Sequence, residues 1–92
     1  MDVTVSFLGP LGEYTGQKRI LIHFPDGAVY GDLLDEIDRQ FGARFPEALW
    51  DREQRQFKKG VLVIGFGRDL GDEKTPLTDG EEIKMVPVLA GG

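Results

Sequence analysis

A change of hydrophobic period partway along the chain constrains the fold more than any other feature of the sequence. Between residues 30 and 41 the apolar positions fall on one side of a 3.6-residue helix, and charged residues fall on the other. Acidic residues crowd the first turns, where they favour the positive end of the helix dipole. We therefore expect one amphipathic helix, ended by Gly42 in the left-handed (αL) conformation. Its apolar stripe consists of Leu33, Leu34, Ile37 and Phe41.

The segments before this helix follow a two-residue period instead. Residues 2–8 and residues 18–24 alternate apolar with polar side chains, which is typical of strands with one buried face. Glycine and proline residues punctuate the stretch between them, so we expect a hairpin with a long loop. The inward positions are Val3, Val5 and Phe7 in the first strand and Ile20, Ile22 and Phe24 in the second.

The stretch directly after the helix is harder to assign. Residues 44–59 contain a proline, a tryptophan and mixed charges, and we expect irregular chain there with a helical turn near residues 47–50. Residues 61–66 are nearly all apolar, which is typical of a central strand covered on both faces or nearly so. We expect this strand to lie at the core of the sheet.

A last strand is predicted close to the C-terminus. The pair Asp79-Gly80 predicts a tight turn, because both residue types tolerate the backbone angles that such turns need. The strand then covers residues 82–87, with Ile83 and Met85 facing inward.

The predicted order of elements is strand, strand, helix, strand, turn, strand. A chain of 92 residues with 40% hydrophobic content has room for one small core, and neither the helix nor the sheet could bury its apolar face alone. We therefore predict an α+β, β-grasp (ubiquitin-like) fold, with a mixed four- to five-stranded sheet and one main helix packed across one face. The expected boundaries are a domain over residues 1–87 and a flexible C-terminal tail over residues 88–92.

Charge and composition exclude several classes of function. The formal net charge of −5 opposes binding to phosphate backbones, so we expect no nucleic-acid partner. The acidity fits either a preference for basic partners or simple solubility, and both interpretations stay open. The longest apolar run, residues 61–64, is far too short to span a bilayer, and the first residues do not resemble a secretory signal. We expect a cytoplasmic protein that does not insert into membranes.

Several side-chain clusters resemble functional motifs, but structural roles explain them better. With no cysteine and one histidine, the chain lacks the residues for a thiolate metal site or a catalytic triad. The acidic helix residues lack calcium-loop spacing and are interpreted as a solvated face, the histidine as a surface strand residue, and a small basic patch as balance for acidic neighbours. We expect no metal and no cofactor bound by the chain itself. The residues concerned are Asp32, Asp35, Glu36, Asp38, His23, Arg52, Arg55, Lys58 and Lys59.

The C-terminal quarter carries a family resemblance. Residues 76–83 (PLTDGEEI) and residues 86–92 (VPVLAGG) resemble the C-terminal signature of sulfur carriers of the MoaD/ThiS type, closest to MoaD-like proteins. Residues 24–34 resemble the second strand, turn and helix start of the same family, so the resemblance spans most of the chain. Residues 65–68 (GFGR) depart from the asparagine-glycine turn that many relatives have, which leaves the subfamily open.

The resemblance implies that the working part of the chain is its C-terminus. A terminal carboxylate is an anion at neutral pH and a poor electrophile, so it must be activated. In the family an E1-like, ATP-dependent enzyme adenylates this carboxylate, which then becomes a thiocarboxylate. The resemblance therefore implies that Gly92 bears the adenylate and the sulfur, with ATP used by the activating enzyme. Gly91 lacks a side chain, which lets the tail enter a narrow channel.

The resemblance also implies protein partners and no side-chain catalysis by this chain. A larger synthase subunit would supply the catalytic residues, and this chain would be the sulfur-donating small subunit of a two-protein molybdopterin synthase. Carriers for thiazole, tRNA thiolation or cysteine synthesis share the same tail, and a ubiquitin-like protein modifier or a binding module remains an alternative. We expect partners to dock on Phe7, Val86, Val88, Leu89 and Ala90, although Phe7 fits a core position equally well.

Overall fold

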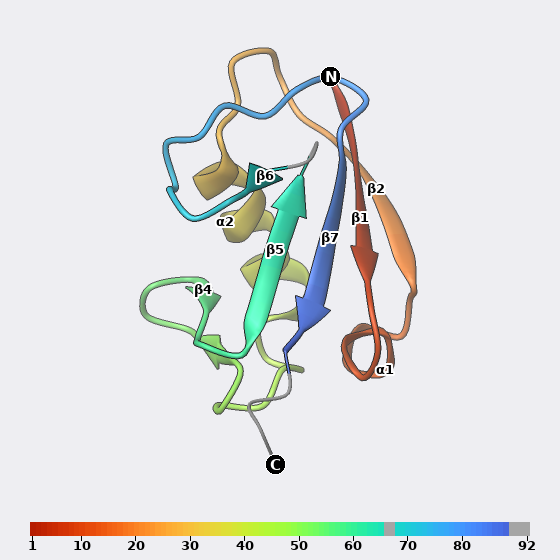
Figure 1. Ribbon diagram of the computed structural model, residues 1–92, viewed down its shortest axis with the longest axis vertical. Helices are drawn as coiled ribbons and strands as arrows, with labels where there is room; N and C mark the ends of the chain where they lie inside the picture. Colours follow the sequence, from red (N-terminus) through yellow and green to blue (C-terminus); the bar gives the residue numbers. More distant parts are fainter. Residues whose placement is uncertain (66–67, 89–92) are drawn as a thin grey trace.

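The chain folds into a sheet with a helix packed across one side, as a computed structural model of residues 1–65 and 68–88 shows (Figure 1). Both helices lie in the first half of the chain, and strands follow the second helix. In order they are β1 (Asp2–Phe7), α1 (Leu11–Thr15), β2 (Arg19–His23), α2 (Tyr30–Phe41), β3 (Trp50–Asp51), β4 (Gln56–Phe57), β5 (Val61–Gly65), β6 (Arg68–Asp69) and β7 (Glu82–Pro87).

The main sheet has five strands in the order β2-β1-β7-β5-β6. The first strand β1 runs parallel to the last strand β7, and the other neighbours are antiparallel. Helix α2 lies behind this sheet in Figure 1 and covers one of its faces. The α+β, β-grasp prediction, with a mixed sheet and one main helix, is confirmed.

The core lies between α2 and the covered face of the sheet. All four residues of the predicted helix stripe are at most 3% exposed, and the inward positions of β1 and β7 join them. This arrangement is what the two hydrophobic periods require, because each layer buries the apolar face of the other. The most completely buried members include Val3, Val5, Leu33, Ile37, Ile83 and Met85.

The centre of the sheet is β7, so the prediction of a central strand at residues 61–66 was wrong. Strand β5 has β7 on one side and only the two-residue strand β6 on the other. Val63 is buried, whereas Leu62 is 39% exposed, so only one face of β5 is covered. The apolar run was misleading because a second helix layer, which would bury both faces, is absent from the described part of the chain.

Two segments expected to be irregular contain short elements. The loop between β1 and β2 includes α1, which ends at Gly16 in the αL conformation with φ 75°. The stretch 44–59 forms a two-stranded hairpin, in which Trp50 of β3 pairs with Phe57 of β4. The expected turn near residues 47–50 exists as hydrogen bonds from the N–H groups of residues 49 and 50 to the carbonyl of Pro46.

The residue after α2 has a different role from the one expected. Gly42 has φ −53° and ψ −37°, which is right-handed helical geometry, so the αL prediction was wrong. Its N–H donates to the carbonyl of Asp38 at 2.9 Å. A Cβ at this position would lie 2.7 Å from that carbonyl oxygen and would also overlap the Asp38 carboxylate. Glycine is therefore required for space here and not for a positive φ.

Candidate functional site

The candidate site is the end of β7, from which the chain continues toward its C-terminus. Strand β7 lies between β1 and β5. Its pairing with β1 reaches Met85, and its last residues, Val86 and Pro87, pair with β5. Pro87 is paired with Val61, and the N–H of Val88 donates to the carbonyl of Gly60 at 2.7 Å. Backbone hydrogen bonding thus extends through Val88, one residue past the predicted domain boundary.

Exposed and half-buried apolar side chains lie around this end of β7, and we call them the exit patch. Leu62 is directly opposite Val86 in the sheet, so the two side chains share its open face. Leu8 follows β1 and donates its N–H to the carbonyl of Met85. This hydrogen bond places Leu8 beside Val86, on the opposite side from Leu62. Val88, which directly follows β7, is 52% exposed. The exit patch consists of Leu8, Leu62, Val86 and Val88.

The exit patch agrees only partly with the partner-binding residues expected from the sequence. Val86 is half-buried and Val88 exposed on the open face, as a docking surface requires. Phe7 is 3% exposed and packs edge to face on Phe41, with ring centroids 5.4 Å apart, so its core interpretation is the correct one. Sequence reasoning missed Leu8 and Leu62. Leu62 was hidden in a run taken to be wholly buried, although one helix can cover only one face of a sheet.

The tail itself lies outside the described residues. This applies to Leu89, Ala90, Gly91 and Gly92, which include the proposed adenylate and thiocarboxylate bearer. The structure therefore describes the strand that carries the tail and the surface around its start. The assignments made to these four residues stay predictions, as does the flexibility assigned to residues 88–92.

The acidic side of α2 is only partly the solvated face that was expected. Asp35 is exposed and pairs with Arg55 at 3.1 Å. Asp38 is a structural residue instead, because its carboxylate accepts a 2.8 Å hydrogen bond from Trp50 Nε1 and lies 3.4 Å from Arg52. Among the described residues, no group of three or more histidine or acidic side chains could hold a metal ion. The basic residues Arg52 and Arg55 balance acidic neighbours, as expected.

The ionisable groups with shifted pKa values lie away from the exit patch. His23 is on the surface of β2, with Nδ1 2.7 Å from Asp2 Oδ1, and this hydrogen bond lowers the pKa of Asp2. Arg39 and Gln40 lower the pKa of Glu36 in the same way, by hydrogen bonds to its carboxylate. Burial, together with the charge of Glu73, raises the pKa of Tyr30. These shifts have structural causes, and none requires a catalytic role.

Comparison with known proteins supports the assignment of the fold and the family. The chain is 30% identical over 95 residues to small archaeal modifier protein 3 of Haloferax volcanii, with 100% of both chains covered. The crystal structure of small archaeal modifier protein 1 (SAMP1) from the same organism superposes with a TM-score of 0.79 at 18% identity over 100% of both chains. A putative molybdopterin converting factor, subunit 1, from Pyrococcus furiosus has a TM-score of 0.73 at 22% identity, with 97% of this chain and 99% of that one covered. No family model matches the sequence.

A β-grasp domain whose central strand leads directly into the C-terminal segment is a ubiquitin-like protein. Among the helices of the described residues, none has the length and apolar character needed to cross a membrane. The 30% sequence identity to the Haloferax protein identifies a family within the ubiquitin-like proteins. The chain belongs to the family of small archaeal modifier proteins, and it has their ubiquitin-like fold.

Proposed function

We propose that the C-terminal carboxyl group of Gly92 is the reactive group of this protein, and that the chain carries sulfur on it as a thiocarboxylate. The observation that carries the proposal is the position of β7, the central strand, which leads the chain out of the sheet beside the exit patch. A rigid stem and an apolar surface at its end are what a partner needs to guide a terminal residue into its own active site.

Strand β7 holds the start of the tail in place, and the tail beyond it reaches toward the partner's active site. The hydrogen bond between Val88 and Gly60 fixes the start of the tail. Residues 89–92 extend at most about 14 Å beyond it, at roughly 3.3–3.6 Å per residue. This length lets a docked partner keep its reactive centre well away from the exit patch. The two terminal glycines present no side chain to the walls of a narrow channel.

The proposed chemistry has two steps, and a separate ATP-dependent adenylating enzyme performs the first. The carboxylate oxygen of Gly92 attacks the α-phosphate of ATP, which forms an acyl adenylate and releases pyrophosphate. Hydrosulfide (HS⁻) then attacks the acyl carbon and displaces AMP, and loss of the proton from sulfur leaves a thiocarboxylate. The chain itself contributes the acyl group and the docking surface, and we propose that it binds no cofactor.

We propose molybdopterin synthesis in the cytoplasm as the use of this sulfur, with a larger synthase subunit as the acceptor. The support is the structural likeness to the Pyrococcus protein, whose name describes it as subunit 1 of a converting factor. The second candidate is protein modification, in which the activated Gly92 forms an amide with a lysine of another protein. The name of the Haloferax relative, a modifier protein, favours this alternative. Both candidates share the adenylation step.

The tail proposal is tested by adding one alanine after Gly92. We expect this variant to fold normally and to lose adenylation, measured as ATP–pyrophosphate exchange with the activating enzyme, because the reactive carboxylate is displaced by one residue. The matched control adds the same alanine before Met1, and it should retain full exchange. Unchanged exchange by the C-terminal variant would disprove the proposal.

Intact-mass analysis of the chain purified from its own host separates the two candidates. A sulfur carrier should include a fraction that is heavier by the replacement of one oxygen with sulfur. That fraction should react with an alkylating reagent although the chain has no cysteine. If the only products are conjugates to lysines of other proteins, the chain is a modifier.

The exit patch is tested separately by changing Leu62, which lies on the scaffold and not in the tail. Leu62→Asp should lower kcat/KM for adenylation by about tenfold or more, the effect of losing one buried apolar contact. Leu21→Asp is the control, since Leu21 is 68% exposed on the edge strand β2, remote from the exit patch. Equal effects of the two substitutions would show that the exit patch has no special role.

A further inference from the structure

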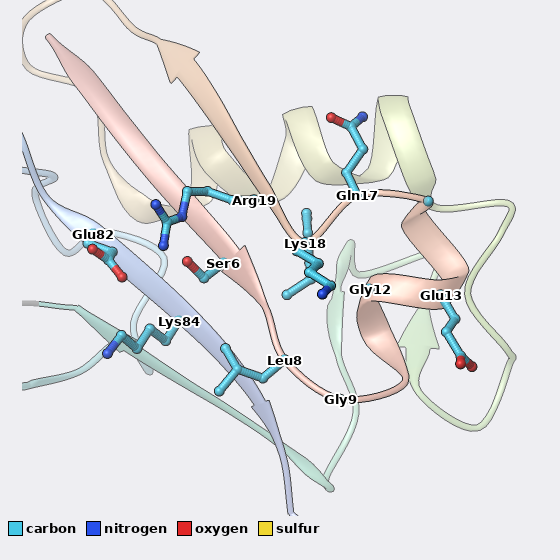
Figure 2. Close-up of a pocket in the computed structure, with 12 residues that line it drawn as sticks. Ser6, Leu8, Gly9, Gly12, Glu13, Gln17, Lys18, Arg19, Glu82 and Lys84 are labelled. Carbon is cyan, nitrogen blue, oxygen red and sulfur yellow. The ribbon is translucent and has the colours of Figure 1, made fainter.

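A groove lies next to the exit patch on the open face of the sheet, and no step of the proposed sulfur chemistry uses it. Its volume is about 990 Å³, and its walls come from the end of β1, helix α1, the start of β2 and β7. Figure 2 shows the side chains of Arg19 and Lys84 on either side of Ser6, with Leu8 at one end. The charged residues that line it are Glu13, Lys18, Arg19, Glu82 and Lys84.

Ser6 is the unusual residue of this groove. It is only 8% exposed, and its Oγ is buried without a hydrogen-bond partner. It is the only buried side-chain oxygen or nitrogen in this state among the described residues. Burial of an unpaired hydroxyl destabilises the fold, so such groups are rare and call for an explanation. A ligand that hydrogen-bonds to Ser6 when it binds would provide one.

Two unpaired cations flank this hydroxyl. Ser6 on β1 is directly opposite Arg19 on β2 and directly opposite Lys84 on β7. Neither cation has an ion-pair partner within the described part of the chain. The other arginines with described side chains all have partners: Arg39, Arg52 and Arg55 bind carboxylates, and Arg44 donates to the carbonyl of Thr15.

We propose that this groove binds a carboxylate side chain from an acidic segment of a partner protein. The hydroxyl of Ser6 would donate one hydrogen bond to the carboxylate, and Arg19 and Lys84 would supply the opposite charge from the two neighbouring strands. Glu82 lies two residues before Lys84 on the same face and would repel an anion placed over that part of the sheet. The carboxylate would therefore lie toward Leu8, away from Glu82.

The occupant should be a protein, because the groove is continuous with the exit patch. Leu8 belongs to both surfaces, and it is 37% exposed. A partner that covers the exit patch would place its next residues over Ser6. Because Ser6 Oγ is closed to solvent in the described structure, the side chains over it must move aside before a carboxylate can reach the hydroxyl. The inference does not depend on sulfur chemistry, since it involves no residue of the tail.

The test is an NMR titration of the ¹⁵N-labelled full chain with the blocked peptide acetyl-Gly-Leu-Glu-Gly-amide. We expect saturable shifts of the backbone amides of Ser6, Arg19 and Lys84, in the millimolar range of affinity. The same peptide with glutamine in place of glutamate should cause no saturable shift in these residues. Inorganic phosphate is titrated in parallel. If phosphate saturates the groove and the peptide does not, the proposal of a protein carboxylate is overturned.

Substitutions then test each group of the groove. Ser6→Ala should weaken peptide binding about tenfold, the value of a hydrogen bond to a charged group, while Tm stays the same or rises because an unpaired hydroxyl is removed. Arg19→Gln and Lys84→Gln should each weaken binding about two- to fivefold, as expected for exposed ion pairs. Lys58→Gln removes one charge outside the groove and should leave binding unchanged.

Two further results would overturn the inference. One is unchanged peptide affinity in Ser6→Ala and in both glutamine variants, and the other is equal weakening by Lys58→Gln, which would indicate a nonspecific charge effect. A variant lacking Gly91 and Gly92 separates this inference from the proposed function. It should lose adenylation and bind the peptide with full affinity.

Discussion

At the scale of single residues, Gly42 shows that a glycine after a helix can be required for space. Its right-handed backbone would accept any residue, and replacing such a glycine by alanine normally stabilises a protein by about 0.4–1 kcal/mol. Here we expect the substitution by alanine to lower the stability of the protein. The new Cβ would lie 2.7 Å from the carbonyl oxygen of Asp38. Gly42→Ala should therefore destabilise the fold by about 1–3 kcal/mol, measured by urea denaturation.

Gly71→Ala is the matched control for this prediction. A Cβ added to Gly71 meets no atom within 4 Å, and its backbone has no positive φ. Its free energy of unfolding should stay within about 0.5 kcal/mol of the original chain. If Gly42→Ala were equally neutral, the steric explanation would be wrong.

The Asp2–His23 pair gives a prediction about pH. A hydrogen bond from His23 holds the pKa of Asp2 below its ordinary value. A lowered carboxyl pKa contributes stability above the unfolded pKa, and this contribution is lost as the pH falls through the folded pKa. His23→Gln should therefore raise the pKa of Asp2 toward its ordinary value, measured by NMR titration of the carboxyl carbon. No change would mean that the 2.7 Å contact does not persist in solution.

At the scale of elements, the β3–β4 hairpin contacts α2 through a buried tryptophan and through the ion pairs of Arg52 and Arg55. Trp50 packs against Phe45 and Phe57, with ring centroids 5.6 Å and 4.8 Å away, and its Nε1 donates to Asp38. Asp38→Ala would leave a buried donor without an acceptor, and we expect a loss of about 1–3 kcal/mol in urea denaturation. Asp35→Ala, which removes only an exposed ion pair on the same helix, should cost less than about 1 kcal/mol. Equal losses would contradict this role for Asp38.

The elements that the sequence predicted well are those with a long and regular hydrophobic period. Helix α2 and strand β7 have the predicted bounds, because both follow one period over their whole length. The short elements α1, β3 and β4 were missed, since two to five residues do not establish a period. Their stability comes from contacts with distant residues, such as the one between Trp50 and Asp38. Such contacts cannot be deduced from local sequence.

At the scale of the whole molecule, β7 should be the most protected part of the chain. It is hydrogen-bonded on both sides, and Met85 in its middle is fully buried. We expect its amides, with those of β1, to show the slowest hydrogen exchange, at rates set by global unfolding. The β3–β4 hairpin has only two residues in each strand and should exchange faster through local opening. Faster exchange in β7 than in the hairpin would contradict this ordering.

The candidate site was predictable only in part, because some of its residues are brought together by contacts between distant parts of the chain. The glycines near the C-terminus and the residues leading to them are visible in the sequence, so the tail and Val86 and Val88 could be named. The exit patch also contains Leu8 and Leu62, which come from other strands and meet β7 only through the register of the sheet. Pairing between β1 and β7 joins residues almost eighty positions apart, for example Ser6 and Lys84. No local pattern specifies such a pairing.

The parallel pairing of β1 with β7 also has a consequence for synthesis. A ribosome produces β1 first and β7 last, so a nascent chain that lacks residues 82–87 has a vacancy in the middle of its sheet. The strand that fills this vacancy is the one that leads to the terminal glycines. A partner that recognises the assembled sheet would therefore not bind a chain that stops before β7.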